Sequence, residues 1–138
     1  MESGWEPFSF SLQPDKVKAG EILWERATLP VSSKEETLRF LSVDQLFQVY
    51  LDDTLLYHMG DPEHSDEMTT GNTLHLVRLP VIKNPSKLCF RLFSRTSNIG
   101  LNGKVSIGLG QNHLANLFKE EILKLIFSAI FFKFLSFV

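Results

Sequence analysis

Five aromatic and arginine residues of this chain have side chains suited to binding a polar ligand: Trp24, Arg26, Tyr50, Tyr57 and Arg91. Tryptophan and tyrosine rings can stack on the C–H faces of sugar rings, while neighbouring polar groups bind the sugar hydroxyls. The same residue types also form cross-strand pairs and the edges of hydrophobic cores. Composition alone therefore does not decide between ligand binding and structural packing at any of these positions. If they bind a ligand, a carbohydrate is the kind of ligand that these residue types suit.

Motifs for enzyme catalysis or metal binding are weak or missing. The sequence has no glycine-rich phosphate loop, no Gly-x-Ser-x-Gly elbow and no His-x-x-x-His pair. Asp52 and Asp53 could supply carboxylates for glycoside hydrolysis, but carboxylates that simply form turns are far commoner. We interpret residues 58–67, HMGDPEHSDE, as a solvated acidic loop rather than a metal site. We therefore expect no enzyme activity, no metal and no cofactor.

Two further chemical groups are interpreted as structural. His75 lies in an alternating segment between Leu74 and Leu76, which favours a hydrogen-bonded histidine on the less buried face of a strand. Cys89 is the single cysteine, and its apolar surroundings predict a small buried side chain. One cysteine also excludes an intramolecular disulfide framework.

Short strands are the elements that would position these side chains. The apolar residues of 45–51 share one face, with Gln48 and Tyr50 on the other, which is the period of a half-buried strand. Asp52-Asp53 then predicts a turn, and a second strand resumes at 55–57. Seven or eight short strands predict an antiparallel sandwich or barrel, and no internal repeat is evident. The other predicted strands are 22–29, 37–43, 74–79, 88–93 and 105–109.

The hydrophobic core is predicted from the apolar face of each strand. An error of one residue in the phase of a strand would move all of its side chains to the opposite face. The predicted core residues are Leu38, Phe40, Phe47, Val49, Leu51, Leu74, Leu76, Leu88, Phe90 and Leu92.

The end of the chain has a different character. Residues 111–138 contain no glycine or proline and become steadily more apolar, so we place a boundary near Gly110 between a β-sandwich domain, 1–110, and a C-terminal segment, 111–138. Apolar residues at helical spacing predict a helix that begins near His113, capped by Asn112. A membrane-spanning helix needs about 20 apolar residues, and the chain offers 17 residues from Ile122 onward, two of them lysines. This segment is interpreted as the start of a transmembrane helix or as a hydrophobic helix buried in a core or a dimer interface.

Composition bounds the class of protein. The chain has 138 residues, of which 43% are hydrophobic and 22% are charged, with a formal net charge of −2. This balance excludes a disordered chain, which would be poor in apolar residues and strongly charged. It also argues against a dedicated nucleic-acid binder, because such proteins present a basic surface. One folded domain with a true hydrophobic core is expected.

Several short motifs occur in order along most of the chain: WER at 24–26, QLFQVYLD at 45–52, YHMG at 57–60, HLVRLP at 75–80 and SRTSNIGLNG at 94–103. Their order resembles the N-terminal extracytoplasmic domain of bacterial membrane-bound sensors. In that family a jelly-roll domain precedes a bundle of membrane helices, as in seven-transmembrane-type receptors, and a cytoplasmic diguanylate cyclase or histidine kinase. The segment around VYLD is also similar to galactose-binding-like accessory domains of glycosidases.

The resemblance implies an all-β, antiparallel jelly-roll (galactose-binding-like) sandwich followed by a C-terminal hydrophobic helix. It implies a sensor domain at the extracytoplasmic face of the bacterial cell membrane, which binds a small molecule such as a carbohydrate and reaches the membrane through its helix. The alternatives are a stand-alone carbohydrate-binding module and a structural or oligomerisation domain that forms homodimers; no nucleic-acid partner is expected. The predicted ligand-binding residues are Trp24, Arg26, Tyr50, Asp52, Tyr57 and His75.

Overall fold

The computed structural model describes residues 17–61, 71–96, 99–101, 105–119, 122 and 124. The strands of this part of the chain are β1 (Ile22–Leu29), β2 (Glu36–Val43), β3 (Leu46–Leu51), β4 (Thr54–Met59), β5 (Asn72–Leu79), β6 (Ser86–Phe93) and β7 (Ser106–Gly108). Each matches a predicted strand to within two residues at either end. The alternation of apolar and polar residues was therefore a sufficient signal for where the strands lie.

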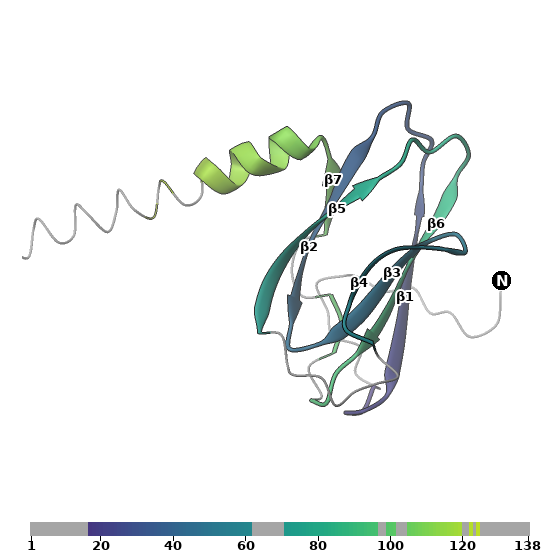
Figure 1. Ribbon diagram of the computed structural model, residues 1–138, viewed down its shortest axis with the longest axis vertical. Helices are drawn as coiled ribbons and strands as arrows, with labels where there is room; N and C mark the ends of the chain where they lie inside the picture. Colours follow the sequence, from purple (N-terminus) through teal and green to yellow (C-terminus); the bar gives the residue numbers. More distant parts are fainter. Residues whose placement is uncertain are drawn as a thin grey trace, which may run out of the picture.

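The strands form two antiparallel sheets that face each other (Figure 1). One sheet has four strands in the order β1-β6-β3-β4, and the other has three in the order β5-β2-β7. The predicted all-β sandwich is thus confirmed. The pairing is nested, because β1 pairs with β6, β2 with β5 and β3 with β4. Among β1 to β6, the outermost strands in sequence are therefore partners and the innermost pair is the β3–β4 hairpin, while β7 pairs with β2.

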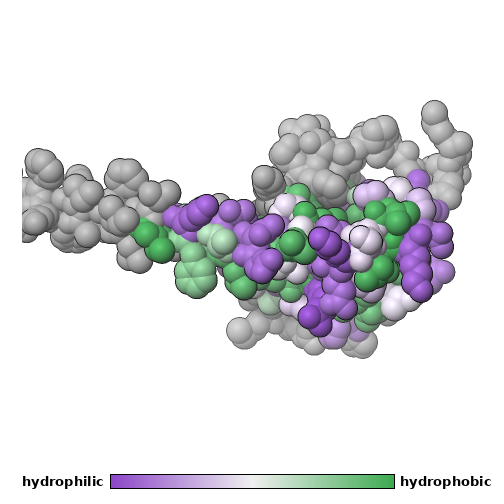
Figure 2. Space-filling model, turned by 90° about the horizontal axis from the view of Figure 1, so that it is seen from above, coloured by the Kyte–Doolittle hydropathy of each residue, from purple (hydrophilic) through white to green (hydrophobic). Residues whose placement is uncertain are grey.

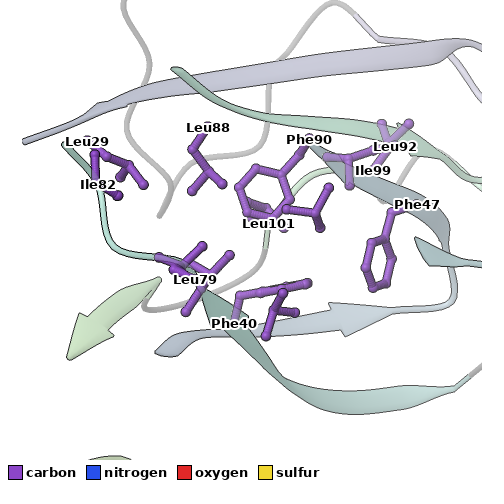
Figure 3. Close-up of a cluster of buried hydrophobic side chains, with 13 residues drawn as sticks. Leu29, Phe40, Phe47, Leu79, Ile82, Leu88, Phe90, Leu92, Ile99 and Leu101 are labelled. Atoms are coloured by element: carbon purple, nitrogen blue, oxygen red, sulfur yellow. The ribbon is translucent and has the colours of Figure 1, made fainter. Parts of the chain in front are cut away.

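The core fills the space between the two sheets with side chains from both (Figure 3). Phe40 from the three-stranded sheet packs edge-on against Phe47 and Phe90 of the four-stranded sheet, with 5.2 Å between ring centroids in both pairs. Such edge-to-face pairs add to the stabilisation that burial of the rings supplies. The buried apolar residues are Leu29, Leu38, Phe40, Phe47, Val49, Val77, Leu79, Ile82, Leu88, Phe90, Leu92, Ile99 and Leu101.

Seven of the ten predicted core residues are buried, and Leu51 packs against the core while partly exposed. The prediction is wrong for Leu74 and Leu76, which lie on the outer face of β5 and are 38% and 41% exposed. The inward side chains of β5 are instead His75, Val77 and Leu79. Each face of this strand carries two apolar residues, Leu74 and Leu76 on one and Val77 and Leu79 on the other. Alternation alone therefore did not decide which face is buried.

Two aspartates shape the turns of the sandwich. Asp44 and Asp52 adopt positive φ angles of 47° and 51°, a conformation that aspartate tolerates better than most side chains do. Asp52 forms the predicted β3–β4 turn and bonds to β6, since its N–H donates to the Lys87 carbonyl oxygen (2.7 Å) and its Oδ1 accepts from the Lys87 N–H (2.8 Å). The turn therefore extends the pairing of β3 with β6 beyond the end of β3.

An internal repeat with an offset of 50 residues organises the fold, so the expectation of no repeat is wrong. The LPV triplet at 29–31 recurs at 79–81, and the L-x-F motif at 38–40 recurs at 88–90. Adding 50 to the residue numbers of β1 gives the bounds of β5, and adding 50 to those of β2 gives the bounds of β6. The offset also preserves the register: Trp24 lies opposite Arg91, and their counterparts Leu74 and Leu41 lie opposite each other. Few positions repeat their residue type, which hides the period in the sequence.

The repeat distributes both halves of the chain over both sheets. In the four-stranded sheet, β6 of the second half lies between β1 and β3 of the first. In the three-stranded sheet, β2 of the first half lies between β5 and β7 of the second. The counterparts Ser32 and Ile82 bridge the halves through two backbone hydrogen bonds of 2.9 and 3.1 Å. Each sheet is therefore built jointly by both halves.

Residues 110–119 form a short helix that points away from the sandwich (Figure 1). It begins at Gly110, so the predicted start near His113 with Asn112 as cap is wrong. His113 lies inside the first turn, where its Nε2–H donates to the Thr37 carbonyl oxygen (3.0 Å). A Cβ at Gly110 would lie only 3.0 Å from Thr37 Oγ1, which favours glycine at this close approach. The helix is thus attached to β2.

Exposed apolar side chains follow one side of this helix. Leu114, Phe118 and Ile122 are exposed and recur every four residues, and Figure 2 shows hydrophobic and hydrophilic side chains on different sides of the projecting helix. Among the described residues, no helix combines the length and apolar character needed to cross a membrane. The predictions for 125–138 lie outside the described residues.

Candidate functional site

The outer face of the four-stranded sheet carries a cluster of large polar and aromatic side chains, here called the aromatic–arginine face: Trp24, Arg26, Gln48, Tyr50 and Arg91. Directly opposite residues of antiparallel strands share a face. Trp24 on β1 lies opposite Arg91 on β6, which lies opposite Gln48 on β3. Two residues further along, Arg26, Cys89 and Tyr50 form the next row. Three strands therefore contribute to one surface.

Contacts within the aromatic–arginine face fix the orientation of its members. Gln48 Oε1 accepts hydrogen bonds from the Tyr50 hydroxyl (2.8 Å) and from the Arg91 guanidinium (3.1 Å). The same guanidinium lies over the Trp24 ring, with 5.9 Å from Cζ to the ring centroid, and the Trp24 and Tyr50 centroids are 6.0 Å apart. Cation–π attraction and hydrogen bonding thus hold the rings and the charge side by side.

The exposure of Trp24 distinguishes it from a core residue. Its side chain is 46% exposed, although tryptophan gains more than any other side chain from burial. The two rings and the guanidinium offer stacking surfaces and hydrogen-bond donors at one place. This arrangement can bind a ligand that has both a flat apolar face and acceptor oxygens, as a sugar ring does.

The internal repeat provides a comparison within the molecule. The counterpart of the Trp24–Arg91 pair is the Leu74–Leu41 pair on the outer face of the three-stranded sheet, in the same register. The counterpart of Arg26 is Leu76. Because the same backbone arrangement accepts leucines, the fold does not require tryptophan or arginine at these positions. A role outside folding is therefore favoured for Trp24 and Arg91.

Of the six predicted ligand-binding residues, Trp24, Arg26 and Tyr50 come together on the aromatic–arginine face. The predicted ligand-binding residues included neither Gln48 nor Arg91, although the residue type of Arg91 had marked it as suited to a polar ligand. The signal for Gln48 was present, since alternation in 45–51 already placed it on the same face as Tyr50. The place of Arg91 opposite Trp24 depends on which strands are neighbours, and the sequence does not reveal that.

Tyr57 and His75 lie instead between the sheets, out of reach of a ligand on the outer face. His75 is 3% exposed. Its Nε2 bonds to Ser42 Oγ (2.8 Å) and its Nδ1 to the Tyr57 hydroxyl (3.2 Å), while Phe40 stacks on the ring at 5.0 Å. Burial lowers the pKa of His75, which favours the neutral ring. The prediction of a hydrogen-bonded histidine is confirmed, but its placement on the less buried face is wrong.

Asp52 lies at the turn predicted for it, whereas Cys89 takes a place other than the predicted one. Asp52 Oδ1 is engaged by the Lys87 N–H at the turn, which gives the residue a structural task. Cys89 points outward, between Arg26 and Tyr50, and is only partly buried. Burial nevertheless raises the pKa of its thiol, against the opposing effect of Arg26 and Lys87. A reactive thiolate is therefore not favoured.

Glu25 is the charged residue that sequence reasoning missed. It points into the sandwich from β1, is 5% exposed, and neither of its carboxylate oxygens has a hydrogen-bond partner. Burial raises its pKa from 4.5 to about 7; the nearby Leu101 backbone offsets part of this rise without reaching hydrogen-bonding geometry. Its counterpart in the repeat is His75, so each half has one buried ionisable residue at the same place. The sequence did contain a signal for this placement. Side chains alternate along a strand, so Glu25 must point inward if its neighbours Trp24 and Arg26 point outward.

No family model, curated protein or solved structure matches this chain. Within the described residues, no group of three or more histidine, cysteine or acidic side chains is placed to hold a metal ion. The chemistry of the aromatic–arginine face itself is therefore the basis for any functional assignment.

Proposed function

We propose that this protein is a binding domain whose ligand is a carbohydrate, held on the aromatic–arginine face. The observation that carries the proposal is the exposed Trp24 ring, held beside Tyr50 and Arg91 where the repeat has a pair of leucines. One ring stacks on the C–H face of a pyranose, and the guanidinium and amide N–H groups donate to its oxygens. An open face suits a chain of sugars better than a deeply buried monosaccharide.

The test is glycan binding by the full 138-residue chain. A glycan array identifies the ligand, and isothermal titration calorimetry measures its dissociation constant. A polyoxyethylene detergent is preferred for handling the apolar C-terminal segment, because maltoside headgroups are themselves sugars. Trp24→Ala is expected to weaken binding at least tenfold. Leu74→Ala is the matched control, because Leu74 occupies the corresponding place in the other sheet; equal losses in both variants would refute the site.

The jelly-roll topology is part of the proposal and is supported by the nested strand pairs. A jelly roll is a long antiparallel hairpin rolled over two sheets. Pairs β1–β6, β2–β5 and β3–β4, with β1–β6 and β3–β4 side by side in one sheet, follow that winding. The extracytoplasmic sensor family to which the sequence shows a resemblance uses this topology.

We further propose that the domain is the sensory part of a bacterial membrane signalling protein, on the extracytoplasmic side. In support, only Leu109 separates β7 from the helix, and the helix is bonded to Thr37 of β2. A ligand can shift a conformational equilibrium only by its difference in affinity for the two states. We expect bound glycan to change the hydrogen exchange of amides 110–119; unchanged exchange would favour a stand-alone binding module.

A structural or oligomerisation domain is the remaining alternative. It would use the helix stripe of Leu114, Phe118 and Ile122 as its contact surface and form homodimers. Phe118→Glu would then abolish association, measured by sedimentation velocity, and no glycan would bind. Glycan binding that survives Phe118→Glu would instead support the carbohydrate proposal.

A further inference from the structure

We propose that Glu25 makes the aromatic–arginine face sensitive to pH: β1 stays paired with β6 while the carboxyl group is protonated, and it opens away from β6 when the group ionises. Trp24 and Arg26, the neighbours of Glu25 on β1, belong to this face and move with the strand. The face therefore binds its ligand more tightly below neutral pH than above it. As a regulation of binding the inference rests on the proposed function, but the switch itself is tested without a ligand.

Glu25 occupies a place between the sheets where its polar atoms have no partner. Its side chain is 5% exposed, and neither carboxylate oxygen has a hydrogen bond. It lies opposite Phe90, which belongs to the hydrophobic core. A buried carboxyl group in such surroundings is tolerated as a neutral acid, whereas the anion is far costlier because it has lost its hydration and gained no hydrogen bond.

The internal repeat shows why Glu25 lacks a partner. His75, the counterpart of Glu25, bonds through its ring to Ser42 of β2 at 2.8 Å. The counterpart of Ser42 is Leu92 of β6, a buried apolar side chain. The pairs β1–β6 and β2–β5 have the same register, so Glu25 has a leucine where His75 has its serine partner. The same place thus holds a satisfied ionisable residue in one half and an unsatisfied one in the other.

Other ionisable groups of the described chain lie near the core. His75 of β5 and Tyr57 of β4 point inward and bond to each other at 3.2 Å, and His113 of the helix is bonded to β2. Glu36, at the start of β2, takes an inward position and is half-buried. The remaining inward positions of β2, and those described for β3, β6 and β7, hold no ionisable residue. Burial lowers the pKa of His75, so its ring is neutral where Glu25 ionises and offers no positive charge.

The position of β1 in its sheet makes it the strand that responds. Burial raises the pKa of Glu25 from 4.5 to about 7, so the carboxyl group ionises close to neutral pH. The cost of the buried anion is relieved when its strand carries it into water. Among the described strands, β1 lies at the edge of the sheet and pairs with β6 alone, whereas β6 and β3 are held on both sides. Opening of β1 separates Trp24 from Arg91 and Tyr50, which contact it from β6 and β3.

Hydrogen exchange of the full 138-residue chain, read by mass spectrometry, tests the switch. Protection factors, which correct each amide for its intrinsic exchange rate, are compared at pH 5.5 and pH 8.5 in the natural protein and in Glu25→Gln, which cannot ionise. For amides 22–29 we expect equal protection at pH 5.5 and at least tenfold lower protection of the natural protein at pH 8.5. The edge strand β5 is the internal control, because it holds His75 at the corresponding place; its protection should differ by less than threefold between the two proteins.

Trp24 reports on the face itself. The chain has two tryptophans, Trp5 and Trp24, so Trp5→Phe leaves Trp24 as the single emitter. Between pH 5.5 and pH 8.5 its emission should shift to the red and its quenching by acrylamide should at least double, because the ring leaves Arg91 and Tyr50. Neither change is expected when Trp5→Phe is combined with Glu25→Gln. Glu25→Leu, combined with Trp5→Phe in the same way, gives the same test if the buried amide disturbs folding.

Equal protection of amides 22–29 in the natural protein and in Glu25→Gln at pH 8.5 would overturn the inference, since the ionised carboxylate would then be accommodated in place. Equal losses in β1 and β5 would overturn it as well, because the whole sandwich would be opening. An unchanged Trp24 emission would show that the face stays assembled, with the same consequence. All three results leave the carbohydrate proposal standing, whereas an absence of glycan binding at pH 5.5 would overturn that proposal and leave the switch intact.

Discussion

Glu25 leads to a prediction about how stability depends on pH. The residue is 5% exposed without a hydrogen-bond partner, and burial raises its pKa from 4.5 to about 7. A carboxyl group with a raised pKa stays protonated in the folded protein while it ionises in the unfolded chain. The folded state therefore holds more protons between these values, and stability falls as the pH rises from about 4.5 to about 7.

The size of this loss follows from the two pKa values. The difference between 4.5 and about 7 corresponds to about 3 kcal/mol, at roughly 1.4 kcal/mol per pH unit. Glu25→Gln keeps a polar side chain of similar size that cannot ionise. We expect the variant to unfold with a free energy close to that of the natural protein at pH 4, and to be more stable by about 3 kcal/mol above pH 7.

Urea denaturation followed by circular dichroism, from pH 4 to pH 9, measures this difference. His75 acts in the opposite direction, because its lowered pKa makes stability fall as the pH drops below about 6.5. The comparison of the two proteins removes the His75 contribution, which both share. Parallel profiles for the natural protein and Glu25→Gln would refute the reasoning, since they would show that Glu25 does not titrate in this range.

Three further perturbations test the packing. Gln45→Ala should lower the free energy of unfolding by about 2–3 kcal/mol, because the buried backbone C=O and N–H of Gly100 would lose the Gln45 amide that they bond to, at 2.8 and 3.2 Å; a loss below about 0.5 kcal/mol would contradict this. His75→Leu should cost roughly 2 kcal/mol in thermal unfolding, since the hydroxyls of Ser42 and Tyr57 would lose the ring they contact, and an unchanged melting temperature would argue against that role. Trp24→Ala should cost less than about 1 kcal/mol, as expected for an exposed side chain; a larger loss would make Trp24 a folding residue.

The sequence was a good guide to the strands and a poorer guide to their faces. In β3 the apolar Phe47, Val49 and Leu51 alternate with Gln48 and Tyr50, and the faces of these residues were predicted correctly. β5 alternates ambiguously, and its buried face was decided by partners elsewhere in the chain. His75 can be buried because Ser42 of β2 and Tyr57 of β4 form hydrogen bonds with its ring. The sequence around His75 does not indicate these contacts, because both partners lie on other strands.

The candidate site was predictable in its residue types but not in its membership. Exposed aromatic and arginine residues suggested a polar ligand, and Trp24 and Tyr50 indeed lie 6.0 Å apart. Gln48 shares the outward face of β3 with Tyr50, but Arg91 joins them only because β6 is inserted between β1 and β3. This insertion places a strand of the second half of the repeat between two strands of the first half. Too few residues are identical between the halves for the sequence to reveal it.

The nested pairing decides which contacts of the fold a bound ligand reinforces. Trp24 and Arg91 belong to β1 and β6, a pair whose strands lie far apart along the chain, and β1 is an edge strand of its sheet. Closing a long loop carries an entropic cost, and an edge strand has only one partner strand to hold it, so β1 is expected to open readily. A glycan that contacts both residues would hold the two strands together across their seam. Occupancy would then slow the opening of β1, and the saccharide would act as a non-covalent cross-link between two strands that are distant in the sequence.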